Sequence, residues 1–276
     1  MIKYIIDMQL ENGDVMGKIV ALVNQKGGVG KTTSSINLAA SLGVLKQKVL
    51  LVDLDPQGNT TTGIGINKAD IDKSVYDLLI DNAELKEVIV KTKFKNLYVI
   101  PATINLAGAD IELIEKSKLK PGFLKGGQLK KYLDVTKEMF DYIIIDCPPS
   151  LGILTTNALT ASDSVIIPVQ CEFFALEGIM QLLNTIMLAQ KNLNPTLDIE
   201  GVLLTMLDSR TNLGLEVVEE IKSYFKERVY DTIIPRLVRL SEAPSHGKPI
   251  LDYDPQSRGT EAYLNLAKEV IERNGK

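Results

Sequence analysis

Seven short stretches of this chain consist almost wholly of apolar residues, and they constrain the fold more than any other feature. An uninterrupted apolar run is typical of a strand that is buried on both faces. Segments with helical spacing, such as 32–45 and 212–225, separate most of the runs. Because strands that alternate with helices form parallel sheets, the sequence predicts an α/β protein with a doubly wound, mainly parallel sheet flanked by helices. The runs are residues 18–24, 48–53, 97–102, 142–147, 164–169, 201–207 and 229–235.

The sequence predicts one domain. The chain has 276 residues, of which 45% are hydrophobic, and it contains no repeat, low-complexity tract or Pro/Ser-rich linker. That length is enough for one large core. We therefore expect residues 17–276 to form a single domain and residues 1–16 to be a short N-terminal extension. A lysine- and glycine-rich stretch, 115–133, is expected to be a surface loop between two helices.

Charge and cysteine content exclude several classes of protein. The formal net charge of −4 predicts no general attraction to nucleic acid or anionic lipid, so such binding needs a local basic patch. Cys147 and Cys171 lie far apart in sequence, which argues against a disulfide scaffold or a zinc ribbon and favours buried, unreactive thiols. No apolar run approaches the roughly 18 residues of a membrane span. We expect a cytoplasmic protein without stable membrane binding.

The sequence NQKGGVGKTT, residues 24–33, lies between the first apolar run and a helical segment. This strand, loop and helix order is the context that a phosphate-binding P-loop requires. Glycines in the loop permit close backbone approach, so the amides of residues 27–33 can converge on a phosphate. The loop residues expected to contact phosphate are Gly27, Gly28, Val29, Gly30, Lys31, Thr32 and Thr33. Lys31 would reach the β- and γ-phosphates, and the Thr32 hydroxyl would ligate Mg²⁺.

The loop departs from the usual P-loop pattern at its start. Gln25 stands where the first glycine belongs, and an additional lysine, Lys26, precedes the glycines. Lys26 followed by GGVGKTT resembles the deviant Walker A signature, and the chain resembles the ParA/Soj family of partitioning ATPases over residues 17–272. Four further motifs carry the resemblance: LLVDLDPQGN, YIIIDCPPSLG, TMLDSRTNLG and VRLSEAPSHGKPI.

The resemblance implies a role for Lys26 across a dimer interface. In this family the additional lysine contacts the phosphates that the other subunit binds. Two ammonium groups as close as those of Lys26 and Lys31 repel each other unless phosphate neutralises both. A lysine supplied by the partner makes dimerisation depend on ATP and stabilises charge during phosphoryl transfer.

Acidic residues follow two of the predicted strands. Asp53 and Asp55 lie at the end of the second run, at the sheet edge where doubly wound proteins place their sites. By resemblance Asp55 orients or activates the attacking water, while Asp53 is either near the magnesium shell or structural. Asp146 ends a buried run as a Walker B aspartate does, and we expect it to hold Mg²⁺ through water.

The resemblance also implies base and DNA contacts late in the chain. Met206 and Pro235 are expected to flank adenine. Leu237 stands where the family usually has asparagine, so base selectivity is expected to rely more on backbone groups. Positions matching Arg210 and Arg239 carry nonspecific DNA binding in Soj-like proteins, and Arg236 lies beside them. A few arginines per subunit bind phosphate weakly, but an ATP-dependent homodimer doubles the contacts.

The sequence predicts a DNA-partitioning ATPase that uses ATP and Mg²⁺. The resemblance implies ATP-bound dimers on nonspecific double-stranded DNA of the nucleoid, with hydrolysis stimulated by a ParB-like centromere-binding protein. One alternative is a MinD-like ATPase at a membrane, although Gln25 and the lack of a basic C-terminal membrane helix oppose it. Another is a ParA-like ATPase that positions a different cargo.

Overall fold

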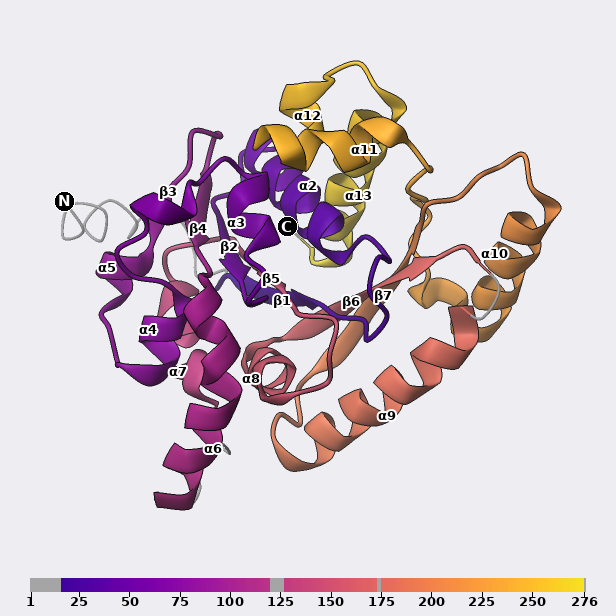
Figure 1. Cartoon of the computed structure of the whole chain (residues 1–276). Helices are drawn as coiled ribbons and strands as arrows, with labels where there is room; N and C mark the ends of the chain where they lie inside the picture. The colour runs from indigo at the N-terminus through magenta and orange to yellow at the C-terminus, as the bar shows by residue number, and fades with distance from the viewer. Residues whose placement is uncertain (1–15, 120–126, 173–174, 276) are drawn as a thin grey trace.

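The computed structural model describes residues 16–119, 127–172 and 175–275. The predicted extension, residues 1–16, lies outside these residues apart from Met16, which is exposed. Over the described residues the chain alternates strands and helices around one sheet (Figure 1). The strands are β1 Lys18–Leu22, β2 Val49–Asp53, β3 Val90–Lys91, β4 Leu97–Ile100, β5 Tyr142–Asp146, β6 Ser164–Gln170 and β7 Asp198–Thr205.

The sheet confirms the predicted doubly wound architecture. Its strand order is β3-β4-β2-β5-β1-β6-β7, so the chain starts near the middle and extends the sheet in both directions. Every pair is parallel except β3 with β4. In such a sheet ligands bind outside the carboxyl ends of the strands, where the order reverses. Here β1 and β2 lie on either side of β5, and the loops after β1, β2 and β5 therefore share one edge.

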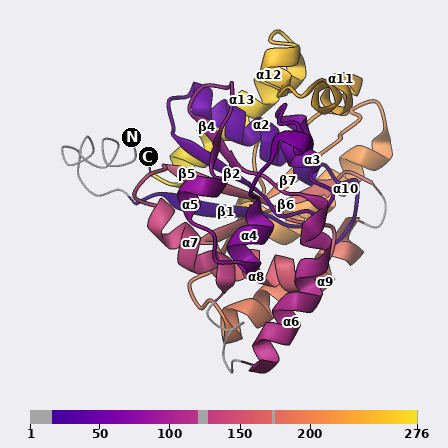
Figure 2. The same ribbon diagram turned by 60° about the vertical axis from the view of Figure 1, so that its left-hand side comes forward.

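Helices cover both faces of the sheet (Figures 1 and 2). Side chains along β1 alternate between the two faces of the sheet. Val20 and Leu22 belong to the core that includes α2 and α13, whereas Ile19 and Ala21 belong to the core on the other face, with α4, α7, α8 and α9. The helices of eight residues or more are α2 Lys31–Val44, α6 Ala109–Leu119, α7 Gln128–Thr136, α8 Ile153–Ala161, α9 Ala175–Asn192, α10 Asn212–Phe225 and α13 Arg258–Arg273. The shorter α-helices are α3 Asn59–Gly63, α4 Val75–Ile80, α5 Leu85–Val88, α11 Val238–Glu242 and α12 Ile250–Tyr253. Short 3₁₀ helices are η1 Lys68–Asp70, η2 Ile104–Gly108, η3 Lys226–Arg228 and η4 Ala243–His246.

Six of the seven apolar runs contain strands, but the prediction for 229–235 was wrong. This segment lies beside β7 and forms two isolated bridges, Val202 of β7 with Val229 and Leu207, just after β7, with Pro235. Between them the amides of Asp231 and Thr232 donate to the carboxylate of Glu269 on α13, at 2.9 and 3.1 Å. Those amides are therefore directed away from the sheet. The segment nevertheless extends the edge of the site beside β7.

The prediction of a loop over 115–133 was also wrong at both ends. Residues 115–119 belong to α6, and residues 128–133 belong to α7. Acidic residues in the first turn of α6 and lysines in its last turn match the helix dipole, which favours helix over loop there. Residues 120–126 lie outside the described residues.

Candidate nucleotide site

The loop between β1 and α2 has the conformation of an anion cradle. Gly28 and Gly30 have φ of 76° and 86°, in the left-handed region that favours glycine. A Cβ added at Gly27 or Gly28 would meet no atom within 4 Å, so open space lies above the loop. Among the described residues, no acceptor is hydrogen-bonded to the amides of these three glycines. These amides, followed by the N-terminus of α2, can receive phosphate oxygens.

The two lysines of the loop lie in different environments. Lys31 begins α2 and is 6% exposed, and its ammonium donates a 3.0 Å hydrogen bond to the carbonyl oxygen of Lys26. The pKa of Lys31 is lowered because burial disfavours the charged form more than Asp146, Cys147 and Asp55 favour it. The side chain of Lys26 is exposed. One lysine therefore faces the interior of the cradle, and the other is available at the molecular surface.

Two polar side chains outside the glycine-rich sequence hold this loop. Asn24 is buried, accepts from the amide of Lys26 at 3.0 Å and donates to the carbonyl of Pro168 at 2.7 Å. The hydroxyl of Thr205, at the end of β7, donates to the carbonyl of Val29 at 2.9 Å. The loop is thus fixed to β6 and β7 as well as to its own strand.

Asp146 is the centre of a hydroxyl network below the cradle. It is fully buried at the end of β5, where its Oδ2 accepts hydrogen bonds from Thr32 at 2.8 Å and Thr60 at 2.7 Å. Its Oδ1 accepts from Ser35 at 3.0 Å. Burial is the largest cause that raises the pKa of Asp146, and the three hydroxyls oppose it. The contact with Thr32 brings together the two residues predicted to hold Mg²⁺.

Asp53 and Asp55 have distinct surroundings. Asp53 is opposite Asp146 in the β2–β5 register and is fully buried. Its Oδ2 accepts from the amide and hydroxyl of Thr61 at 2.8 and 2.6 Å, and its Oδ1 accepts from the amide of Asp55 at 3.2 Å. Burial, together with the nearby carboxylate of Asp146, raises the pKa of Asp53 to about 7. Asp53 therefore holds the loop that carries Asp55.

Asp55 lies beyond the end of β2 and retains 8% exposure. One carboxylate oxygen accepts a 2.9 Å hydrogen bond from the amide of Gln57. Asp55 also contributes to the electrostatic field at both Lys31 and Asp146. This carboxylate thus lies near the cradle and Asp146, a position that suits a group that orients water there.

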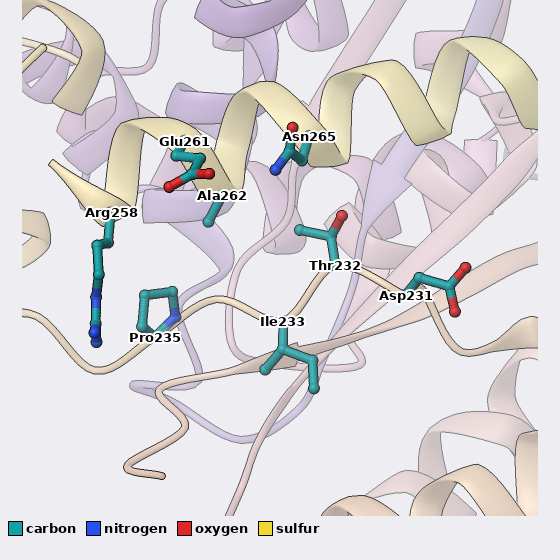
Figure 3. A pocket seen from close by; sticks show the side chains of 8 residues that line it. All are labelled: Asp231, Thr232, Ile233, Pro235, Arg258, Glu261, Ala262 and Asn265. Atoms are coloured by element: carbon teal, nitrogen blue, oxygen red, sulfur yellow. The ribbon is translucent and has the colours of Figure 1, made fainter. Parts of the chain in front are cut away.

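The predicted adenine contacts lie at the end of β7 and on the neighbouring segment. Met206 has a left-handed φ of 54°, and its Cε is 3.6 Å from the position of a Cβ on Gly30. Pro235 lines a surface groove of about 400 Å³ between residues 231–235 and α13 (Figure 3). Leu237 packs against the core with the α2 and α13 side chains, and so offers no polar contact there.

The three predicted DNA-binding arginines are exposed, and each has an acidic neighbour. Arg210 donates to both carboxylate oxygens of Asp208, at 2.8 and 2.7 Å, which holds the pKa of Asp208 well below its usual range. Arg236 lies 3.6 Å from Glu172. Arg239 lies 3.9 Å from Glu242 and 3.8 Å from Asp254. Exposed pairs of this kind contribute little stability, so each guanidinium can exchange its partner for another anion.

The family described as AAA domain matches residues 17–199 of the chain. A Bacillus subtilis protein, sporulation initiation inhibitor protein Soj, is 64% identical over 255 residues, which are 92% of this chain and 98% of that protein. The chromosome partitioning protein ParA of Myxococcus xanthus is 50% identical over 94% of this chain and 89% of its own length. The chain belongs to the ParA/Soj family of chromosome-partitioning ATPases. The predicted family and the prediction of an ATPase are thereby confirmed.

Solved structures place the ParA/Soj fold within a wider group. Cobyrinic acid a,c-diamide synthase from Mycobacterium smegmatis, with bound ADP and magnesium, is similar with a TM-score of 0.78 and 37% identity over 92% of this chain and 93% of that one. The Pyrococcus furiosus cell division ATPase MinD has a TM-score of 0.75 and 28% identity, covering 93% of this chain and 99% of its own. The prediction of ATP and Mg²⁺ agrees with the nucleotides and magnesium in these related structures.

Several residues of this ParA/Soj site were missed by sequence analysis. Ser35, Thr60, Thr61 and Thr205 are buried hydroxyl residues whose partners lie on other elements. Thr60 and Thr61 follow directly on the LLVDLDPQGN motif, and their proximity to it was the only available signal.

Cys147 and Cys171 are buried as predicted, and burial raises the pKa of both thiols. No helix among the described residues has the length and apolar character to span a membrane.

Proposed function

We propose that this chain is a DNA-partitioning ATPase whose ATP-bound homodimer holds duplex DNA without sequence preference. A ParB-like partner stimulates hydrolysis and so releases the dimer from the DNA. The protein would be cytoplasmic and would associate with the nucleoid when ATP is bound. The observation that carries this proposal is the pair of loop lysines, one buried in the cradle and one exposed five residues earlier in the sequence.

The described residues fit a magnesium-bound nucleoside triphosphate. The free amides of the loop and the ammonium of Lys31 would hold phosphate oxygens, and Thr32 with Asp146 would hold Mg²⁺. When bound, the metal ion would neutralise charge that gathers on the phosphate oxygens. Lys31 would exchange its hydrogen bond to a neutral carbonyl for one to an anion, which is the stronger kind. Met206 and Pro235 would contact the base.

The exposed Lys26 supports a composite site. An ammonium at the surface beside the cradle can reach a second protomer that approaches the loop. If the Lys26 ammonium contacts the phosphates bound by the partner, the two protomers associate only when the triphosphate is present. Hydrolysis then removes the γ-phosphate charge that this lysine contacts. Asp55 would orient water within the completed site.

The arginines support the DNA step. Arg210 and Arg236 both act on Asp208 electrostatically, so they lie close to each other, and Arg239 is on the following helix, α11. On binding duplex DNA, these arginines would exchange their carboxylate partners for backbone phosphates, and counterions would be released from the DNA. A homodimer presents two such clusters, so ATP-dependent pairing acts as a switch for DNA binding.

Sedimentation of the protein with duplex DNA of unrelated sequences, in ATP and in ADP, tests the proposal. We expect retention in ATP only, similar for all sequences and falling steeply as salt is raised. A matched arm with anionic liposomes in place of DNA should retain no protein. Retention that ignores the nucleotide, or that occurs on liposomes and not on DNA, would overturn the proposal.

A further inference from the structure

The chain leaves the sheet at Asn24, and the side chain of this residue takes over a hydrogen bond of the sheet. Just after β1, the amide of Val23 still donates to the carbonyl of Ile166 on β6, the strand beside β1 (Figure 1). In a parallel ladder the next carbonyl to accept on this side is that of Pro168, and its donor would be the amide of Gln25. Here the side-chain amide of Asn24 donates to the Pro168 carbonyl instead, at 2.7 Å. Asn24 therefore ends the pairing with β6 and leaves that carbonyl satisfied.

The same side chain holds the backbone of Lys26. Asn24 is 5% exposed, and its Oδ1 accepts from the amide of Lys26 at 3.0 Å. An asparagine side chain carries an acceptor oxygen and a donor nitrogen on one carbon, so it can bridge a backbone amide and a backbone carbonyl. The backbone of Lys26 is thus attached to β6 through one buried side chain.

This attachment differs from the hydrogen bond that Lys31 makes. The Lys26 carbonyl accepts from the Lys31 ammonium, and a bound phosphate competes for that ammonium. Among the described residues, the backbone of Lys26 makes no hydrogen bond besides those to Asn24 and Lys31. When phosphate takes the ammonium, the contact with Asn24 remains. It then fixes the point from which the exposed Lys26 side chain leaves the loop.

The phosphate cradle has attachments of its own. The carbonyl of Val29 accepts from Thr205 of β7 at 2.9 Å, and α2 begins directly after Gly30. Asn24 contacts the part of the loop that precedes the glycines. Loss of Asn24 should therefore displace Lys26 more than it displaces the amides of the cradle.

We propose that Asn24 is a positioning residue for Lys26, because it sets where the Lys26 ammonium is presented to a second protomer. This inference rests on the proposed function, in which Lys26 contacts the phosphates that the partner binds. A lysine side chain has many rotamers, so a backbone that is also free to move spreads the ammonium over a larger volume. In a two-fold symmetric dimer both sites carry that loss of order.

The test compares variants of the full chain that all carry the hydrolysis-blocking Asp55→Ala change. Sedimentation velocity gives the dimer dissociation constant in ATP, and fluorescence gives the affinity for a labelled ADP. ADP lacks the γ-phosphate, so its affinity reports on the cradle of a single protomer. We expect Asn24→Ala to weaken dimerisation by about tenfold or more, because a small displacement of a catalytic group has a large effect. Its ADP affinity should stay within about twofold of the parent.

Asn194→Ala is the matched control. Asn194 is also a buried asparagine, and it donates to the carbonyls of Leu159 and Ser162 at 2.9 and 2.7 Å. These residues lie near the starts of β6 and β7, at the opposite edge of the sheet from the cradle. We expect this variant to match the parent in both dimerisation and ADP affinity.

Asn24→Ser keeps the proposal testable if Asn24→Ala does not fold. A serine hydroxyl can still accept from the amide two residues on, more weakly than asparagine does. We therefore expect dimerisation of Asn24→Ser to lie between the parent and Asn24→Ala. Dimerisation of these variants at the strength of the parent would overturn the inference. An equal loss of ADP affinity would do so as well, because Asn24 would then support the whole cradle.

Lys26→Ala in the same background separates this inference from the proposed function. If Lys26→Ala dimerises as the parent does, the composite site of the proposed function fails. If Lys26→Ala stays monomeric while Asn24→Ala dimerises as the parent does, only the role of Asn24 fails.

Discussion

The ammonium of Lys31 donates a 3.0 Å hydrogen bond to the carbonyl oxygen of Lys26, so the two loop lysines are joined through the side chain of one and the backbone of the other. The bond directs Lys31 into the cradle and leaves the Lys26 side chain at the surface. A phosphate that draws Lys31 away also frees the peptide of Lys26. We propose that nucleotide binding is thereby linked to the position of the Lys26 peptide within this loop.

The hydroxyl of Thr60 supports the predicted magnesium site indirectly. It is fully buried and donates to Asp146 Oδ2 at 2.7 Å. Thr60→Val keeps the shape but removes one of three hydroxyl donors, at a cost of about 1–3 kcal/mol in the free energy of unfolding. We also expect the Mg²⁺ concentration for half-maximal ATPase activity to rise several-fold. Thr62→Val is the control and should alter neither, because among the described residues its exposed hydroxyl donates only to the backbone carbonyls of Gly58 and Asn59 at the start of α3. Equal Mg²⁺ requirements for the two variants would exclude this role of Thr60.

Asp53 should make stability depend on pH. Its pKa is about 7 in the folded protein, mainly because of burial, against an ordinary value of 3.8. Between these values the unfolded chain releases this proton and the folded chain keeps it, so the contribution to stability is present below pH 4 and is lost as the pH rises towards 7. Each unit of pKa difference corresponds to about 1.4 kcal/mol. Urea unfolding of the nucleotide-free protein from about pH 4 to 7 should therefore show wild type losing stability relative to Asp53→Asn. A constant difference between the two proteins would contradict this.

Arg210 can be tested from both sides of its ion pair. Arg210→Ala should abolish DNA retention while ATP-dependent dimerisation survives, because the residue is exposed and bonded only to Asp208 among the described residues. Asp208→Asn is the informative counterpart, since it weakens the competing pair and leaves the guanidinium in place. We expect it to bind DNA at least as tightly as wild type, in the same sedimentation assay. Parent-like DNA retention by Arg210→Ala would remove this residue from the DNA surface.

Sequence analysis predicted those elements that a pattern within a single short segment of the chain reveals. Uninterrupted apolar runs located six strands, and glycine, lysine and aspartate at strand ends located the cradle and Asp146. The strand predicted over 229–235 was wrong because two of its backbone amides, those of Asp231 and Thr232, donate to the carboxylate of Glu269. They are therefore not available for hydrogen bonds to a neighbouring strand, and hydrophobicity does not reveal this. The two-residue strand β3 is too short to produce a pattern. The hydroxyls of Ser35, Thr60 and Thr205 were missed because their partners are set by packing between elements that are remote in sequence.

The central claim is that Lys26 completes the nucleotide site of a second protomer, and the mass of the ATP-bound protein in solution tests it most directly. Asp55→Ala and the double variant Lys26→Ala/Asp55→Ala are compared by size-exclusion chromatography with light scattering in ATP, and Lys95→Ala/Asp55→Ala controls for loss of an exposed lysine elsewhere. We predict that the Asp55→Ala protein and the Lys95 control are dimers, whereas the Lys26 variant binds ATP yet stays a monomer. A Lys26 variant that dimerises as readily as Asp55→Ala alone would contradict the account.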